Sequence, residues 1–129
     1  MSKSSLFNRF LRGRWPGVAR ALLANKERLF YLLRLLVRVI RHRSLAPVVK
    51  ELGVLGSYVV DVVQGRWRDY NRSHLVLIVA LLAYVVSPFD IVPDWIPGAG
   101  FVDDIALVSY VFELLEDELT RYRRSKEEQ

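Results

Sequence analysis

Apolar residues recur along most of this 129-residue chain at the three- and four-residue spacing that is typical of helices. No segment shows the alternation of a β-strand, and no internal repeat is visible. The spacing predicts helices over residues 16–42, 44–64, 74–86 and 102–123, after a shorter amphipathic segment over 5–15. We therefore expect an all-α fold, a compact bundle of about four to five helices.

The predicted helices differ in how much of their surface is apolar. Residues 74–86 are apolar on nearly every side, which predicts the central helix of the bundle. The helix over 16–42 is apolar around most of its circumference, so it is either buried on two sides or partly in lipid. Its charged stripe consists of Glu27, Arg34, Arg38 and Arg41.

The helix over 44–64 has an apolar side and a polar side. The side chains predicted to face solvent are Lys50, Ser57, Asp61 and Gln64. Gly53 and Gly56 lie inside this helix, where glycine costs stability, and we interpret them as allowing a neighbouring helix to approach closely. Gly65 is expected to end the helix, and Ser73 to cap the next one.

Residues 87–104, SPFDIVPDWIPGAGFVDD, concentrate proline, glycine and aspartate between the last two predicted helices. Ser87 and Pro88 are expected to stop the preceding helix, because proline has no backbone donor and restricts the residue before it. Ser87 and Asp90 have the spacing of a helix N-cap and its reciprocal partner. Further prolines prevent a long helix, so the segment is predicted to be a stiff Pro/Asp-rich corner.

This corner and the helices beside it resemble the signature of the YkvA-like family (DUF1232), a group of small, largely bacterial domains of unknown function. The resemblance covers residues 74–119, and similar flanks extend the family-like part to 65–124. It is carried by Leu82, Tyr84, Ser87, Pro88, Asp90, Ile91, Pro93, Asp94, Ile96, Pro97, Gly100, Asp103 and Asp104. Gly98 and Ala99 depart from the pattern, since larger apolar residues are usual there. The resemblance implies a helical domain at a membrane, with no established enzymatic activity. It also implies that the motif residues have a structural role and that Trp95 packs between the last two predicted helices.

Charge divides the chain into two halves. The net charge is +5, but residues 1–50 carry 12 Lys and Arg against one acid, which gives +11, and residues 51–129 carry 7 against 13 acids, which gives −6. Residues 1–15 form a basic amphipathic segment, and residues 16–129 are expected to form a single helical domain. The membrane-contact candidates in the first segment are Leu6, Phe7, Arg9, Phe10, Leu11, Arg12, Arg14 and Trp15.

Neither of the two long apolar runs is predicted to cross a bilayer. Leu75–Val86 has twelve residues, about 18 Å as a helix against a hydrocarbon core of about 30 Å. Leu29–Ile40 contains Arg34 and Arg38, which are costly at mid-bilayer. Cysteine is absent, which excludes disulfides and thiol chemistry, and no secretory signal is visible. We expect the protein on the cytoplasmic side of the inner membrane, either peripheral or as a re-entrant hairpin around the corner.

The aspartates of the corner are candidate oxygen ligands for Mg²⁺ or Ca²⁺. They are Asp90, Asp94, Asp103 and Asp104. Helix caps and turns account for the same residues without an ion, and the spacing matches no EF-hand loop. His42 and His74 are expected to be ordinary surface residues. Because no nucleophile or oxyanion device is recognisable, no enzyme activity, catalytic residue or cofactor is predicted.

Three classes of function remain open. The first is a non-catalytic adaptor or modulator that binds the anionic membrane surface, with a membrane protein as a further partner. The second is a nucleic-acid-binding module that uses Arg34, Arg38 and Arg41, although their leucine and valine flanks are not those of a nucleic-acid reader. The third is a divalent-metal-dependent enzyme built on the aspartates. The sequence does not specify an oligomeric state.

Overall fold

The computed structural model describes residues 3–41, 43–91 and 101–127. Over these ranges the chain forms seven α-helices and one 3₁₀-helix, and it contains no strand. The predicted all-α class is therefore confirmed, but the helices are more numerous than the four to five expected. The elements are α1 (Lys3–Arg12), α2 (Trp15–Leu23), α3 (Lys26–Ile40), η1 (Arg43–Val48), α4 (Val49–Val63), α5 (Arg72–Ile91), α6 (Phe101–Leu114) and α7 (Glu116–Glu127).

The helix predicted over 16–42 is divided into α2 and α3. Asn25 adopts an extended backbone conformation, with φ −134° and ψ 98°, and its Oδ1 accepts a hydrogen bond from the backbone N of Arg28 at 3.2 Å. A side chain that satisfies the first backbone donors of a helix stabilises a helix start at that point. The prediction of one continuous helix was wrong because the apolar spacing continues on both sides of this cap.

The helix predicted over 44–64 begins as the 3₁₀-helix η1. Pro47 lies inside η1 and has no backbone N–H for an α-helical hydrogen bond, so the regular α-helix starts only at Val49. The predicted end is confirmed at Gly65, whose φ of +80° lies in the left-handed region that favours glycine.

α5 is longer than predicted at both ends. Asn71, and not Ser73, caps its N-terminus, because Asn71 Oδ1 accepts hydrogen bonds from the backbone N of Ser73 (2.8 Å) and of His74 (3.4 Å). At the other end the backbone stays helical through Ser87 and Pro88, so the predicted helix stop and the N-cap at Ser87 are wrong. Burial of the long apolar run before this proline outweighs its local cost, which is about 3 kcal/mol in a helix interior.

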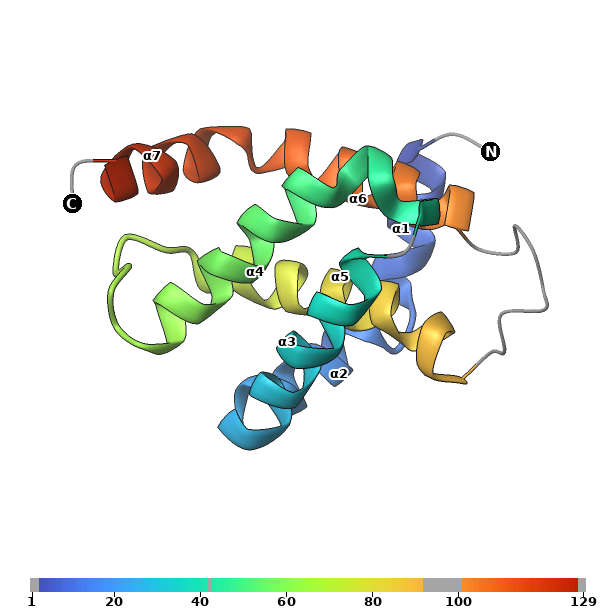
Figure 1. Cartoon of the computed structure of the whole chain (residues 1–129), viewed down its shortest axis with the longest axis horizontal. Coiled ribbons are helices and arrows are strands. Elements are labelled where there is room, and N and C mark those ends of the chain that lie inside the picture. The colour runs from blue at the N-terminus through green and yellow to red at the C-terminus, as the bar shows by residue number, and fades with distance from the viewer. Residues whose placement is uncertain (1–2, 42, 92–100, 128–129) are drawn as a thin grey trace.

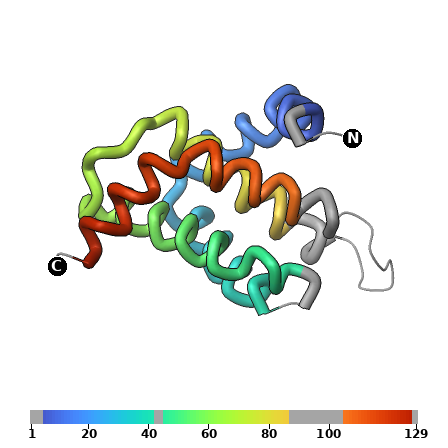
Figure 2. The backbone as a smooth tube through the Cα atoms, turned by 90° about the horizontal axis from the view of Figure 1, so that it is seen from above, coloured from blue at the N-terminus to red at the C-terminus, as the bar shows by residue number. Residues whose placement is uncertain are grey.

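The helix predicted over 102–123 is divided at Leu115 into α6 and α7. The two helices nonetheless run end to end (Figures 1 and 2). Leu115 N donates to Val111 O at 3.0 Å and Leu119 N donates to Leu115 O at 2.9 Å, so the hydrogen-bond ladder is almost continuous. A helix start at this point is favoured by carboxylates at the positive end of the dipole. The acids in the first turn of α7 are Glu116, Asp117 and Glu118.

α5 is the central helix, as the sequence predicts. Residues Ile78–Leu82 are all fully buried, and α5 packs against α2, α3, α4 and α6. In Figure 1, α6 and α7 lie along the top of the molecule, α2 and α3 lie at the bottom, and α4 and α5 lie between them. α5 can be apolar all round because other helices cover it on several sides.

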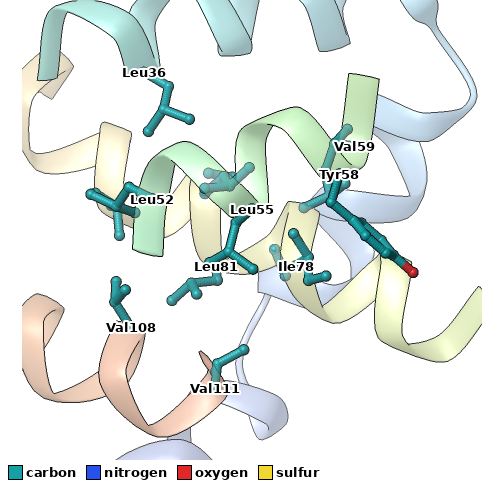
Figure 3. Packing of buried hydrophobic residues seen from close by; sticks show 14 of the residues in the cluster. Leu36, Leu52, Leu55, Tyr58, Val59, Ile78, Leu81, Val108 and Val111 are labelled. Carbon is teal, nitrogen blue, oxygen red and sulfur yellow. The ribbon is translucent and has the colours of Figure 1, made fainter. Parts of the chain in front are cut away.

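The core is built where four helices meet. Figure 3 shows Leu36 of α3, Leu55 of α4, Leu81 of α5 and Val108 of α6 gathered around one interior. Each of these side chains is at most 3% exposed. Burying one such side chain contributes about 1.5–3 kcal/mol, so this interior and not intrinsic helix propensity holds the bundle together.

Candidate membrane-binding surface

The outer face of α3 carries a stripe of exposed side chains, which we call the α3 stripe. It consists of Tyr31, Arg34, Arg38 and Arg41, whose spacings of three, four and three residues place them on one side of the helix. Tyr31 is 55% exposed, and the guanidinium carbon of Arg34 lies 5.9 Å from the centre of its ring. No carboxylate among the described residues forms an ion pair with the three arginines, so their charge is available to a partner.

An open apolar groove of about 720 Å³ lies beside the stripe, between α3 and α4. Its apolar lining comes from Phe30, Leu33 and Val37 of α3 and from Val60 of α4, and the charged residues Glu27 and Arg34 of α3 also line it. Val37 is 55% exposed. The exposed side of α3 therefore combines arginine side chains with apolar surface.

The two glycines of α4 have different surroundings. A Cβ atom on Gly56 would lie 3.2 Å from Cδ2 of Leu36 on α3, so the absence of a side chain lets the two helices approach closely. A Cβ atom on Gly53 would have no described atom within 4 Å. The interpretation of a close helix contact is confirmed for Gly56, but α3 does not explain Gly53.

The apolar side of α1 faces the protein. Leu6 and Phe10 are only 7% and 5% exposed, and the ring of Phe7 lies 5.0 Å from that of Tyr110 on α6. Leu11 is the exception, at 42% exposure. Three of the four apolar membrane-contact candidates within α1 are therefore turned towards the bundle in this structure.

The remaining candidates lie around the junction of α1 and α2. Arg9, Arg12 and Arg14 are exposed, and the guanidinium carbon of Arg14 lies 4.8 Å from the ring centre of Trp15. Trp15 itself is half-buried and packs edge-to-face against Tyr84 of α5, with 5.3 Å between ring centres. The arginines of this segment can reach a membrane while most of its apolar residues hold α1 in place.

The Pro/Asp-rich corner is only partly described. The backbones of Ser87, Pro88 and Asp90 lie in the last turns of α5, and those of Asp103 and Asp104 in the first turn of α6. The motif residues outside the described ranges are Pro93, Asp94, Trp95, Ile96, Pro97 and Gly100. Among the side chains that the structure describes, no three His, Asp or Glu residues gather as a metal site. The ion site and the Trp95 plug stay predictions.

Asp61 is the centre of a polar cluster that sequence reasoning missed. It was predicted to face solvent but is only 6% exposed. Its Oδ1 accepts a hydrogen bond from Arg66 Nε at 2.8 Å, and its Oδ2 accepts one from Tyr122 Oη at 2.5 Å and lies 3.2 Å from Lys126 Nζ. A carboxylate within the apolar run VVDVV is the only hint of burial in the sequence, because its main partners come from α7.

The electrostatics of this cluster are those of a structural link. Burial alone raises the pKa of Asp61, but hydrogen bonds from Tyr122, Arg66 and Lys126 together lower it below its ordinary value of 3.8. Burial, reinforced by the neighbouring Asp61 carboxylate, raises the pKa of Tyr122. Asp61 therefore stays ionised at neutral pH and Tyr122 stays protonated, and neither is poised to exchange protons with a substrate.

A second buried acid joins the start of α5 to α7. Glu118 is 4% exposed, its Oε1 accepts a hydrogen bond from the backbone N of Asn71 at 2.9 Å, and its Oε2 lies 3.0 Å from His74 Nδ1. The side chain of His74 is 40% exposed, so the expected surface position is confirmed, but it also has a specific partner. These contacts position the loop between α4 and α5.

The fold and this surface define a class: a small all-α protein with an exposed helix face on which arginine and apolar side chains lie side by side. Within the described ranges, no helix combines the length and the apolarity that a bilayer crossing requires.

Comparison with known proteins finds similarity over part of the chain. Residues 74–110, which include most of α5 and α6, match the family described as "Protein of unknown function (DUF1232)". Over 63 residues the chain is 43% identical to the "Uncharacterized membrane protein YkvA" of Bacillus subtilis (strain 168). The YkvA-like resemblance is thereby confirmed. This match covers 45% of the chain and 59% of that relative. No solved structure matches the chain. The α3 stripe lies outside the segment that matches the family.

Proposed function

We propose that this protein is a non-catalytic peripheral membrane protein that binds anionic lipid at the cytoplasmic face through the α3 stripe and Val37. There it acts as an adaptor or modulator of a membrane-protein complex. The single observation that carries the proposal is the exposed side of α3, where three arginines without a described carboxylate partner adjoin Tyr31 and Val37, each 55% exposed.

The chemistry of this surface suits a membrane interface. A basic residue near an anionic surface adds about 1 kcal/mol of attraction, screened by salt, so the three arginines contribute about 3 kcal/mol at low salt. Tyr31 and Val37 add the burial of apolar area in the headgroup region, where tyrosine is favoured. The exposed arginines near α1, Arg12 and Arg14, add to the basic half of the chain.

One further observation supports the membrane assignment. The relative from Bacillus subtilis is called a membrane protein. Nucleic acid is a weaker choice because exposed apolar residues beside the arginines have no role on a phosphate backbone.

The proposal is tested by sedimentation with vesicles at low salt. The full chain is expected to bind vesicles that contain phosphatidylglycerol and not vesicles of pure phosphatidylcholine. Changing Arg34, Arg38 and Arg41 together to Gln should abolish most of the binding. A matched control carries the same charge change on α7, at Arg121, Arg123 and Arg124. Full-length protein that stays in the supernatant, or equal loss in both triple variants, would show that the α3 stripe is not a lipid-binding surface.

A further inference from the structure

A separate cavity of about 420 Å³ lies between α2 and α5, next to the end of α1. Arg20 of α2 and Arg72 of α5 both line it. Neither arginine forms an ion pair with a carboxylate of the described residues, whereas Arg66 and Arg121 are paired with Asp61 and Asp69. Two guanidinium groups from different helices thus share one cavity that contains no described acid.

The helix geometry adds to this positive charge. The cavity lies along the N-terminal turns of α5, where the helix dipole is positive. The first turn of α5 contains no acid of its own, and the acid that contacts this helix end is Glu118 of α7, which does not line the cavity. Ser73 supplies a further polar side chain to the lining. An anion in the cavity would have two guanidinium groups, a hydroxyl and the helix dipole in its surroundings.

The rest of the cavity is apolar. Val76, Leu77 and Ala80 follow Arg72 on the same side of α5, and Pro16 of α2 completes this part of the lining. From residue 72 to residue 80 a helix rises about 12 Å. Polarity therefore falls along the α5 side of the cavity, from Arg72 and Ser73 to Ala80. Leu11, which is 42% exposed, lies at the edge.

We infer that this cavity binds one molecule of an anionic lipid, with its phosphate between Arg20 and Arg72 and the start of an acyl chain over Val76, Leu77 and Ala80. Such a lipid would use both parts of the lining. A free phosphate would contact the arginines but leave the apolar part empty, and an uncharged chain would fill the apolar part but leave both arginines without an anion. The inference rests on the proposed function in taking anionic lipid as the ligand, but it uses residues outside the α3 stripe.

The test uses the full chain and monomeric short-chain lipid, without vesicles. Calorimetric titration with dihexanoylphosphatidylglycerol is compared with dihexanoylphosphatidylcholine, which has the same chains without net charge, and with inorganic phosphate, which has charge without chains. Phosphatidylglycerol is expected to bind at least about tenfold more tightly than either, as for ligands that gain charge-assisted hydrogen bonds and apolar burial together. Equal affinity for both lipids, or affinity for phosphate equal to that for phosphatidylglycerol, overturns the inference.

Variants then locate the site. Arg20→Gln with Arg72→Gln should weaken phosphatidylglycerol binding at least about tenfold, since each charged hydrogen-bond donor is lost. A control with the same charge change, Arg123→Gln with Arg124→Gln on α7, should stay within about twofold, as exposed distant charges are largely screened. Both arginines of the cavity are exposed, so thermal unfolding should be unchanged. Equal binding by the two double variants would show that the lipid does not bind in this cavity. Vesicle sedimentation of the α3 variants tests the proposed function separately.

Discussion

Tyr122 Oη on α7 donates a 2.5 Å hydrogen bond to Oδ2 of Asp61 on α4, a residue 61 positions earlier in the chain. Both side chains are buried, and the Tyr122 ring packs edge-to-face against Tyr58 and Trp67 at 5.3 and 5.6 Å. This contact joins the last described helix to the centre of the bundle.

Replacing Tyr122 with Phe should lower the free energy of unfolding by about 1–3 kcal/mol, because the buried Asp61 carboxylate loses a donor while the ring packing is kept. Chemical denaturation measures the loss. In an Asp61→Asn background, the same replacement should cost distinctly less, since the charged acceptor is already gone. Equal costs in both backgrounds would mean that the hydrogen bond does not stabilise the fold.

Acid should remove the contribution of Asp61 to stability. Its pKa in the folded protein lies below the ordinary value of 3.8, so the stabilisation is present above pH 3.8 and is lost as the pH falls through the lower folded pKa. The difference in melting temperature between the natural chain and Asp61→Asn should be constant near neutrality and shrink below about pH 4. A difference that stays constant into acid would contradict the lowered pKa.

The two glycines of α4 should respond differently to alanine. Gly53→Ala should stabilise the protein by about 0.5–1 kcal/mol, because alanine is favoured in a helix and the added Cβ meets no described atom. Gly56→Ala should gain less or destabilise, because its Cβ would press on Leu36 Cδ2 at 3.2 Å. Thermal unfolding compares the two variants. Equal gains would show that α3 and α4 yield easily at this contact.

Residues in α1 should contribute to stability according to their burial. Leu6→Ala should cost about 2 kcal/mol or more, as for a large-to-small change in a core. Leu11→Ala removes the same atoms from a side chain that is 42% exposed and should cost less than about 0.5 kcal/mol. If both changes are neutral in denaturation, α1 does not belong to the core in solution.

Binding to duplex DNA should be weak and strongly salt-dependent. Three arginines that contact phosphates would give a log–log salt slope of roughly −0.9 for each phosphate contacted, so little binding should remain at physiological salt. Fluorescence anisotropy across a salt series measures this slope. Tight binding at physiological salt that is lost on changing Arg34, Arg38 and Arg41 to Gln would favour nucleic acid over lipid as the partner.

The predictions that succeeded from sequence rest on local physics. The apolar run over 74–86 can be stable in water only when it is covered, and the structure buries Ile78–Leu82 completely. Gly65 ends α4 because a residue with positive φ suits glycine, a preference that depends on one position alone. The Arg-bearing side of α3 was also predictable, since the spacing of its residues fixes which of them share a face.

The predictions that failed concern two situations. In one, tertiary packing overrides a local sequence preference, and in the other, the contact partner is distant in the sequence. Ser87 and Pro88 have the local signature of a helix stop, but α5 continues through them. Asp61 has the local signature of an exposed acid, but Tyr122 and Lys126 from α7 cover it. Spacing cannot show which residue 61 positions away will supply a hydrogen-bond donor.

By itself, the sequence determined that the chain is helical, that its longest apolar run is central, that its first half is basic, and that residues 74–110 carry a family signature. Only the tertiary structure decided what covers each apolar face. Leu6 and Phe10 have the same amphipathic pattern whether a membrane or α6 lies against them, and here the bundle covers them while Val37 stays exposed. The physical reason is that the hydrophobic effect is non-directional: periodicity fixes which side of a helix avoids water, whereas packing geometry selects the surface that excludes the water.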